Sequence, residues 1–212
     1  MFGFASKDAS LEALFTKIGR TERQFFVSIL LDSGASVDAK DNKKTAMYID
    51  QAFVLLPRDY YILPNFISEL QNYAEDLAEL LREYGEMIGQ EATCANHDKH
   101  FLRLIQFTQW VVELEVQIAL DLWDESENRN MKLKYNAFKM APGPDNIRAT
   151  FKSVPIDSYV LAISDGVRTD DIDTNTNIVI EHSSYFMWLD ALFDSNAVTT
   201  DQLTNYLALM FL

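Results

Sequence analysis

The chain contains 212 residues, with 32 acidic and 18 basic side chains, which gives a formal net charge of −14 at pH 7. Apolar residues make up 48% of the sequence and include 14 Phe, 9 Tyr and 3 Trp, so a disordered acidic tail is excluded. A chain of this length buries roughly 70% of its unfolded surface without disulfides or metals. Cys94 is the single cysteine, so no disulfide can form within the chain.

The sequence indicates a soluble protein in a reducing, cytoplasmic location. Its first ten residues lack the basic start and apolar run of a secretory signal, and no apolar stretch approaches the ~20 residues of a membrane span. The strong negative charge argues against direct binding to nucleic acid or to an anionic membrane, because like charges repel. We therefore expect a basic protein partner, no nucleic acid and no membrane.

Apolar residues at three- and four-residue intervals predict four helices in the first part of the chain. The expected helices cover residues 10–31, 43–56, 64–89 and 98–123. Gly34 follows the end of the first helix, and Pro57 ends the second, because proline disfavours α geometry in the residue before it. The fourth helix is apolar around most of its circumference, as the buried central member of a bundle would be.

After the polar segment 124–130, apolar and polar residues alternate, which predicts strands. The expected strands cover residues 131–135, 147–154, 159–164 and 177–181, and two helices close the chain near 185–193 and 201–212. The predicted fold class is α+β, with an N-terminal antiparallel four-helix bundle followed by a small antiparallel sheet and two C-terminal helices. The expected domains are a helical bundle over 1–127 and a small α+β region over 128–212, either separate or fused with the bundle.

Common catalytic motifs are absent from the sequence, including GxxxxGK[ST], GxGxxG, GxSxG and HExxH. One segment places a potential metal ligand at every third residue, at Glu91, Cys94, His97 and His100. This ligand set would suit zinc, but three-residue steps turn 300° on an α-helix, so the set converges only if residues 91–96 form a loop. The favoured interpretation is a polar helix start, and we assign no catalytic residue, metal or cofactor.

Residues 171–182 are similar to the start of a calcium-binding EF-hand loop. Thr176 stands where the loop needs glycine, and His182 stands where it needs a bidentate glutamate. The segment is therefore predicted to be a polar turn that leads into a strand, without calcium.

An acidic ridge lies on the outer side of the third expected helix, formed by Glu75, Glu79, Glu83 and Glu86. Residues 59–127 contain 15 acidic and 3 basic side chains, a net charge of −12, and Arg82 is the single basic residue of this helix. Such a ridge can simply keep the protein soluble, pair with the basic segment 128–152, or dock on a basic surface and steer its association. The four glutamates are our partner-surface candidates.

The two C-terminal helices carry apolar side chains that belong either to the core or to an interface. These side chains are Tyr185, Phe186, Trp188, Leu189, Leu192, Tyr206, Leu207, Met210, Phe211 and Leu212. The core is the favoured assignment, and a homodimer through this segment is the alternative.

Missing enzyme motifs and the charge distribution lead to one functional hypothesis. We expect a non-enzymatic cytoplasmic protein that presents its acidic helical face to a basic protein partner, as an inhibitor, immunity factor or adaptor does. A metal-dependent enzyme that uses the region of Cys94, His97 and His100 is the first alternative, and a structural assembly subunit is the second. The sequence does not identify the partner, the substrate or the pathway.

Overall fold

The structure is a computed structural model, and it describes residues 10–87, 97–121, 130–166 and 174–210. These residues form helices and a four-stranded sheet, so the α+β fold class is confirmed. By their contacts they divide into two compact units. The helical unit contains the described residues of Val54–Leu122 and Asp201–Leu212, and the sheet unit contains those of Ala9–Phe53 and Trp123–Thr200. The domain boundary expected near residue 127 stays a prediction.

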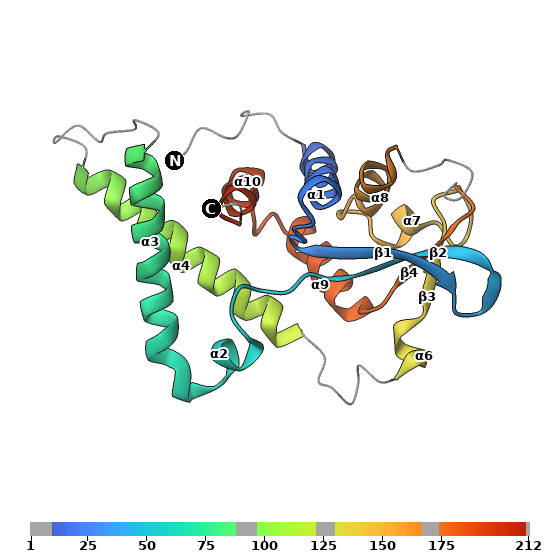
Figure 1. Ribbon diagram of the computed structural model, residues 1–212, viewed down its shortest axis with the longest axis horizontal. Coiled ribbons are helices and arrows are strands. Elements are labelled where there is room, and N and C mark those ends of the chain that lie inside the picture. The colour runs from blue at the N-terminus through green and yellow to red at the C-terminus, as the bar shows by residue number, and fades with distance from the viewer. Residues whose placement is uncertain (1–9, 88–96, 122–129, 167–173, 211–212) are drawn as a thin grey trace. The chain divides into compact units, whose positions relative to one another are not determined.

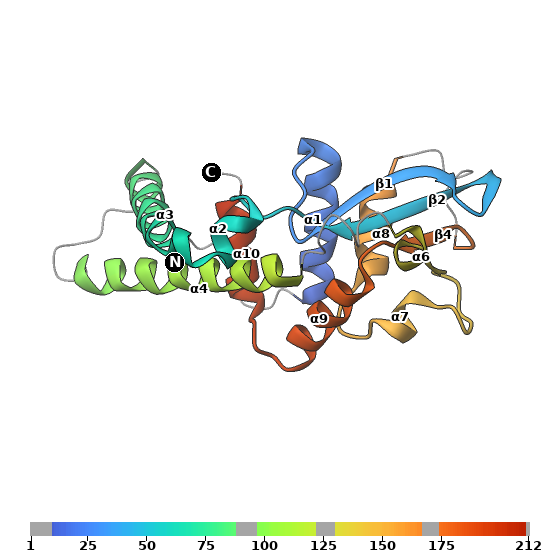
Figure 2. The same cartoon turned by 90° about the horizontal axis from the view of Figure 1, so that it is seen from below.

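The helical unit is built around two long helices that pack against each other (Figures 1 and 2). Its elements are α2 (Arg58–Ile62), the 3-10 helix η1 (Pro64–Phe66), α3 (Ile67–Met87), α4 (His97–Asp121) and α10 (Thr200–Leu209). Leu77 and Leu81 of α3 are buried, as are Leu104 and Leu114 of α4. The long helices expected over 64–89 and 98–123 are therefore confirmed.

A buried carboxylate joins four helices of this unit. Glu115 of α4 is 0% exposed, and its Oε2 atom accepts hydrogen bonds from the hydroxyls of Tyr61 on α2 and Tyr73 on α3, both at 2.9 Å. Its Oε1 atom accepts a third, at 3.2 Å, from Tyr206 on α10. Burial raises the pKa of Glu115 above its usual value, and the three hydroxyls oppose this only in part.

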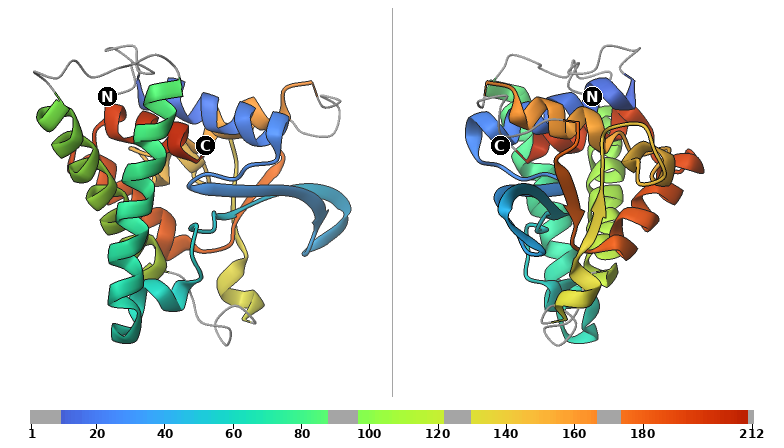
Figure 3. Two further views of the ribbon diagram at one scale, coloured as in Figure 1. Left: turned by 60° about the vertical axis from the view of Figure 1, so that its left-hand side comes forward. Right: turned by 90° about the vertical axis from the view of Figure 1, so that its right-hand side faces the viewer.

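The sheet unit combines a mixed four-stranded sheet with helices from both ends of the chain (Figures 1 and 3). Its elements are α1 (Leu11–Phe25), β1 (Leu31–Asp38), β2 (Asp41–Gln51), α6 (Met131–Lys134), β3 (Asn136–Phe138), α7 (Ile147–Thr150), α8 (Ile156–Ser164), β4 (Asn177–Ile180) and α9 (Ser183–Asp194). The strand order is β1-β2-β4-β3, in which β2 and β4 are parallel and the other two pairs antiparallel.

Alternation along the strands gives this sheet an apolar face and a polar face. Met47 and Ile49 of β2 are buried, whereas their neighbours Tyr48 and Asp50 are only half-buried. In the register, Tyr48 lies opposite Gly34 of β1. The polar face therefore carries small and polar side chains at the β1 side of the sheet.

Helices α1 and α8 lie side by side in this unit, and Figure 3 shows both next to the β1–β2 hairpin. They approach each other closely at Gly19, where an added Cβ atom would lie 2.7 Å from the backbone oxygen of Tyr159. Glu22, one turn later on α1, accepts hydrogen bonds from the hydroxyl of Tyr159 and from the Ser33 backbone N–H, the latter at 3.0 Å. Burial raises the pKa of Glu22 as well.

Several predicted elements are wrong, and with them the antiparallel four-helix bundle and the purely antiparallel sheet. Helix α1 ends at Phe25 rather than near residue 31, and the helix expected over 43–56 is strand β2. The strands expected over 131–135, 147–154 and 159–164 contain the helices α6, α7 and α8. The segment of β2 forms a strand because it pairs with β1 and β4, and such tertiary contacts override a weak local preference for helix.

Within the described ranges, no helix combines the length and the apolar character that crossing a membrane requires.

Candidate functional site

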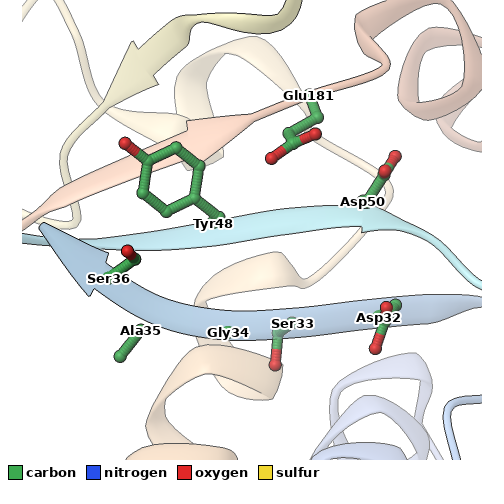
Figure 4. Close-up of a pocket in the computed structure, with 8 residues that line it drawn as sticks. All are labelled: Asp32, Ser33, Gly34, Ala35, Ser36, Tyr48, Asp50 and Glu181. Atoms are coloured by element: carbon green, nitrogen blue, oxygen red, sulfur yellow. The ribbon is translucent and has the colours of Figure 1, made fainter. Parts of the chain in front are cut away.

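A pocket with a volume of about 410 Å³ opens on the polar face of the sheet unit, next to the edge strand β1. Figure 4 shows Tyr48 and Asp50 of β2 beside Glu181, which directly follows β4, with β1 running along the other side. The β1 side of the pocket is formed by Asp32, Ser33, Gly34, Ala35 and Ser36. Three strands thus bring three carboxylates and small side chains to one place.

Each carboxylate of the pocket has one polar side-chain contact that fixes its position. Asp32 accepts a hydrogen bond from the Ser28 hydroxyl at 2.7 Å, and Asp50 contacts Nδ1 of the buried His182. Glu181 forms an ion pair with the Lys134 ammonium at 2.8 Å. The oxygen atoms of these three carboxylates can accept more hydrogen bonds than these contacts use. The pocket can therefore bind further hydrogen-bond donors, including a cationic group.

Strand β1 is an edge strand whose outer side has a definite hydrogen-bonding pattern. The Ser33 N–H donates to Glu22 Oε1 and therefore points away from β2. In an antiparallel pair, every second residue directs both its N–H and its C=O away from the partner strand. Ala35 therefore also points outward, and its backbone groups have no hydrogen-bond partner among the described residues.

The hairpin that joins β1 and β2 is held by a buried carboxylate at the end of β1. Asp38 accepts hydrogen bonds from the Tyr135 hydroxyl at 2.7 Å, the Lys40 N–H at 2.8 Å and the Asn177 amide. Burial alone would raise the pKa of Asp38, but these hydrogen bonds outweigh it and lower the pKa to about 2. Burial and the bond to Asp38 raise the pKa of Tyr135 to about 12. The far end of the pocket-bearing hairpin is therefore anchored to β4 and to the segment after α6.

The predicted acidic ridge lies on α3, in the other unit. Glu75 and Glu79 line a groove between α3 and α4, whereas Glu83 and Glu86 are exposed beyond its lining. The groove has a volume of about 1100 Å³ and a largely apolar floor that includes Leu70 and Ile105.

Arg82 neutralises part of this ridge from within. Its guanidinium lies 2.7 Å from the carboxylate of Glu86 and 3.4 Å from that of Glu79. Only Glu75 and Glu83 of the four predicted residues lack an ion pair within the described part of the helix. The partner role of the ridge stays a prediction.

The predicted metal-ligand segment lies largely outside the described residues. Glu91 and Cys94 fall in the gap 88–96, and His97 and His100 lie in the first turns of α4, with side chains that are not described. Among the described residues, no group of three or more His, Cys, Asp or Glu side chains could hold a metal ion. Of the EF-hand-like stretch 171–182, only residues 171–173 lie outside the described ranges, and Asn177–Ile180 forms β4 as expected.

Half of the C-terminal apolar cluster is buried in the core. Tyr185, Phe186 and Leu189 are buried in the sheet unit, and Tyr206 and Leu207 are buried in the helical unit. Phe211 and Leu212 lie outside the described residues. The core assignment is confirmed for the buried members, and the homodimer stays a prediction.

Sequence reasoning missed the pocket because it placed a helix over most of β2 and predicted no strand at β1. The alternation of Met47 and Ile49 with Tyr48 and Asp50 is a period-two signal that was available. It covers only four residues, and lysine and alanine around it favour a helix. The pairing of β4 with β2, more than 120 residues apart in the sequence, has no local signal at all.

The comparison with protein families identifies what this chain is similar to. A family model described as peptidase family M13 matches residues 3–212. A comparison with curated proteins gives no match.

Solved structures share this fold. The zinc metalloprotease Zmp1 of Mycobacterium tuberculosis in its open state matches 93% of this chain with 21% identity and a TM-score of 0.71, and the same protease with an inhibitor matches with a TM-score of 0.68. A Haemonchus galactose-containing glycoprotein complex matches 94% of this chain and 29% of its own, with 17% identity and a TM-score of 0.63. The chain spans 27% of the length of the two Zmp1 structures.

The family match corrects the functional hypothesis. A non-enzymatic inhibitor, immunity factor or adaptor is contradicted, because the matching family is one of peptidases and its model covers nearly the whole chain. The expectation that the protein is not an enzyme is wrong for the same reason. The missing motifs were weak evidence against an enzyme, because they exclude only the kinds of site that these motifs describe within these 212 residues.

Proposed function

The chain belongs to peptidase family M13, and we propose that it forms part of a zinc metallopeptidase that hydrolyses peptide bonds. The observation that carries the proposal is the family match over residues 3–212. The similar fold of Zmp1, described as a zinc metalloprotease, supports it at the level of architecture.

The residues of this chain do not fit a zinc centre of the usual peptidase kind. The sequence lacks HExxH, in which two histidines one helical turn apart bind zinc and the glutamate acts as general base. The described side chains provide no alternative group of ligands. We therefore propose that this chain contributes a folded accessory part, and that the zinc ligands and the general base come from elsewhere in the enzyme.

Peptide hydrolysis by the enzyme at its natural length tests the activity. Quenched fluorescent peptides of mixed sequence should be cleaved, cleavage should stop with 1,10-phenanthroline, and added zinc should restore it. Absence of cleavage by the zinc-loaded enzyme across the whole peptide mixture would contradict the proposal.

Elemental analysis of the 212-residue chain after gel filtration tests where zinc binds. We expect no stoichiometric zinc in this chain. One zinc per chain that is lost in Cys94→Ala or His97→Ala would instead place a metal site in the segment of Glu91, Cys94, His97 and His100.

Three expectations from the sequence remain proposals: a cytoplasmic location, a basic partner at the acidic ridge, and a homodimer through the C-terminal apolar segment. The apolar floor of the α3–α4 groove and its acidic rim at Glu75 and Glu79 support the second. Burial of five of the ten residues in the C-terminal cluster reduces the apolar surface that the third could use.

A further inference from the structure

We propose that the open edge of β1 binds an extended peptide by strand addition, and that a lysine or arginine side chain of the peptide enters the acidic pocket beside it. The inference rests on the proposed function, because it names a class of peptide for a peptidase. It concerns a binding site within the sheet unit and involves no catalytic group.

The backbone of β1 offers the hydrogen bonds that strand addition needs. Ala35 directs its N–H and C=O away from β2, and the Ser33 C=O points the same way. A peptide in extended conformation would bind these groups as a fifth strand of the sheet. Main-chain hydrogen bonds of this kind supply affinity in many peptide-binding proteins, and pockets for alternate side chains supply specificity.

Among the described residues, the edge from Gly34 to Ser36 is accessible and lacks the usual protection of edge strands. Gly34, Ala35 and Ser36 are exposed, and a Cβ atom added at Gly34 would meet nothing within 4 Å among the described residues. Exposed edges are commonly blocked by lysine, proline or a bulge. The section of β1 from Leu31 to Val37 contains neither residue, and its single irregularity lies at its end, between Val37 and Asp38.

The pocket determines which peptide side chain fits. Asp32, Asp50 and Glu181 place three carboxylates around a volume of about 410 Å³, and Lys134 is the one lysine or arginine paired with them in the described ranges. A lysine or arginine side chain would supply the missing positive charge through charge-assisted hydrogen bonds. An acidic side chain would be repelled.

A basic peptide fits this edge better than a second copy of the chain. Pairing of two β1 edges would bring two sets of these carboxylates together, on molecules that each carry a net charge of −14. Like charges placed against each other in an interface oppose association. The charge therefore selects a cationic peptide.

Fluorescence anisotropy with the 212-residue chain tests the inference. The probe is a labelled seven-residue peptide of alternating threonine and valine with lysine at the centre. Matched peptides carry norleucine or glutamate at the centre, or N-methyl groups on alternate backbone nitrogens. We expect the Kd to rise about tenfold or more on N-methylation and several-fold on replacing lysine by norleucine, with the glutamate peptide weakest.

Variants of the chain locate the binding site. Ala35→Pro removes an outward N–H without removing a β1–β2 hydrogen bond, a position at which edge strands tolerate proline, and should weaken every peptide. Asp32→Asn with Glu181→Gln should weaken the lysine peptide and leave the norleucine peptide unchanged. The control Glu83→Gln removes an exposed carboxylate of α3 and should change nothing. If Ala35→Pro fails to fold, the N-methylated peptides on the unaltered chain test the same hydrogen bonds.

Equal affinity for the lysine, norleucine and glutamate peptides, or indifference to N-methylation, would overturn the inference. So would a chain that forms dimers through this edge and binds no peptide. Binding is measured without hydrolysis, so the two proposals fail separately. Zinc-dependent cleavage without binding at β1 leaves the proposed function intact, whereas binding without any cleavage by the full enzyme leaves this inference intact.

Discussion

Phe26 combines a left-handed backbone conformation with an exposed aromatic side chain. It follows α1 with φ 57° and ψ 35°, in the left-handed region, and its N–H donates to the Glu22 carbonyl oxygen at 2.8 Å. Glycine is the usual residue at such a helix end, because a side chain there costs roughly 1–2 kcal/mol. The Phe26 side chain is 90% exposed, so burial does not offset this cost.

Phe26→Gly should therefore raise the free energy of unfolding by about 1 kcal/mol, because it relieves the left-handed strain and removes almost no buried surface. Urea unfolding measures the change. The matched control is Phe25→Gly, one residue earlier and still helical, which should lower stability by about 1 kcal/mol through helix propensity. A clear loss of stability in Phe26→Gly would mean that the aromatic ring contacts something outside the described residues.

Single residues also show the limit of sequence reasoning about the site. The four ridge glutamates are visible because they share a helix and a spacing, and α3 does place them on one helix. The pocket carboxylates Asp32, Asp50 and Glu181 share neither. They come from three strands, and nothing in the sequence near each one indicates the other two.

At the level of elements, α1 and α8 pack closely because a small residue, Gly19, lies between them. Gly19 of α1 faces α8, and its position next to the Tyr159 backbone oxygen and the Ala162 Cβ atom leaves no room for a methyl group. Both neighbours belong to a packed helix, so neither can move without shifting α8.

Gly19→Ala should lower the free energy of unfolding by about 2 kcal/mol, since overpacking a helix contact outweighs the roughly 1 kcal/mol that alanine gains in helix propensity. The same substitution at Gly34, where an added Cβ meets no described atom, is the control and should change stability by less than about 0.5 kcal/mol. Thermal unfolding of the two variants gives the comparison. Equal effects at both positions would show that α1 and α8 are less closely packed than this.

The β1–β2 hairpin depends on Asp38, whose pKa is lowered to about 2. A carboxylate with a lowered folded-state pKa stabilises the protein above its unfolded pKa, near 4, and loses this contribution as the pH falls toward 2. Asp38→Asn should therefore cost about 2 kcal/mol at pH 7.

The cost of Asp38→Asn should also shrink steadily between pH 4 and pH 2. Urea unfolding of both proteins across this range measures the difference. A cost that does not vary with pH would mean that the amide disturbs packing rather than removing a stabilised charge.

Elements with a strong, continuous local signal could be predicted, and the others could not. The apolar stripes of α3 and α4 repeat over more than five helical turns, so their helices follow from sequence alone. In α8, nine residues rich in β-branched and aromatic side chains suit either state, and packing on α1 selects the helix. The β2–β4 pairing requires the fold itself.

At the scale of the whole molecule, each unit buries a glutamate without a cation among its described hydrogen-bond partners. Glu22 of the sheet unit contacts Ser33 and Tyr159, and Glu115 of the helical unit contacts three tyrosines. Burial raises the pKa of both carboxyls. This arrangement joins several elements in each unit, but an ionised carboxylate inside a protein whose net charge is already −14 carries a cost.

The sign of the pH dependence follows from these raised pKa values. A carboxyl whose folded-state pKa lies above its unfolded value binds more protons in the folded state. Its contribution is therefore most favourable below the unfolded pKa and is lost as the pH rises through the folded pKa. Stability of the unaltered protein should decrease from mildly acidic toward alkaline pH on account of these two groups.

Glu22→Gln together with Glu115→Gln should make this decrease shallower, because glutamine keeps an acceptor oxygen for the hydroxyls and has no proton to lose. The free energy of unfolding of the double variant should increase relative to that of the unaltered protein as the pH rises above the unfolded pKa, in a series from pH 5 to pH 9. Urea unfolding at fixed ionic strength measures it, with Glu83→Gln on the exposed side of α3 as the control for losing a negative charge. A stability difference that stays constant over this range would show that both glutamates have the same proton affinity in the folded and unfolded chains, and that their hydroxyl partners fully replace the solvent.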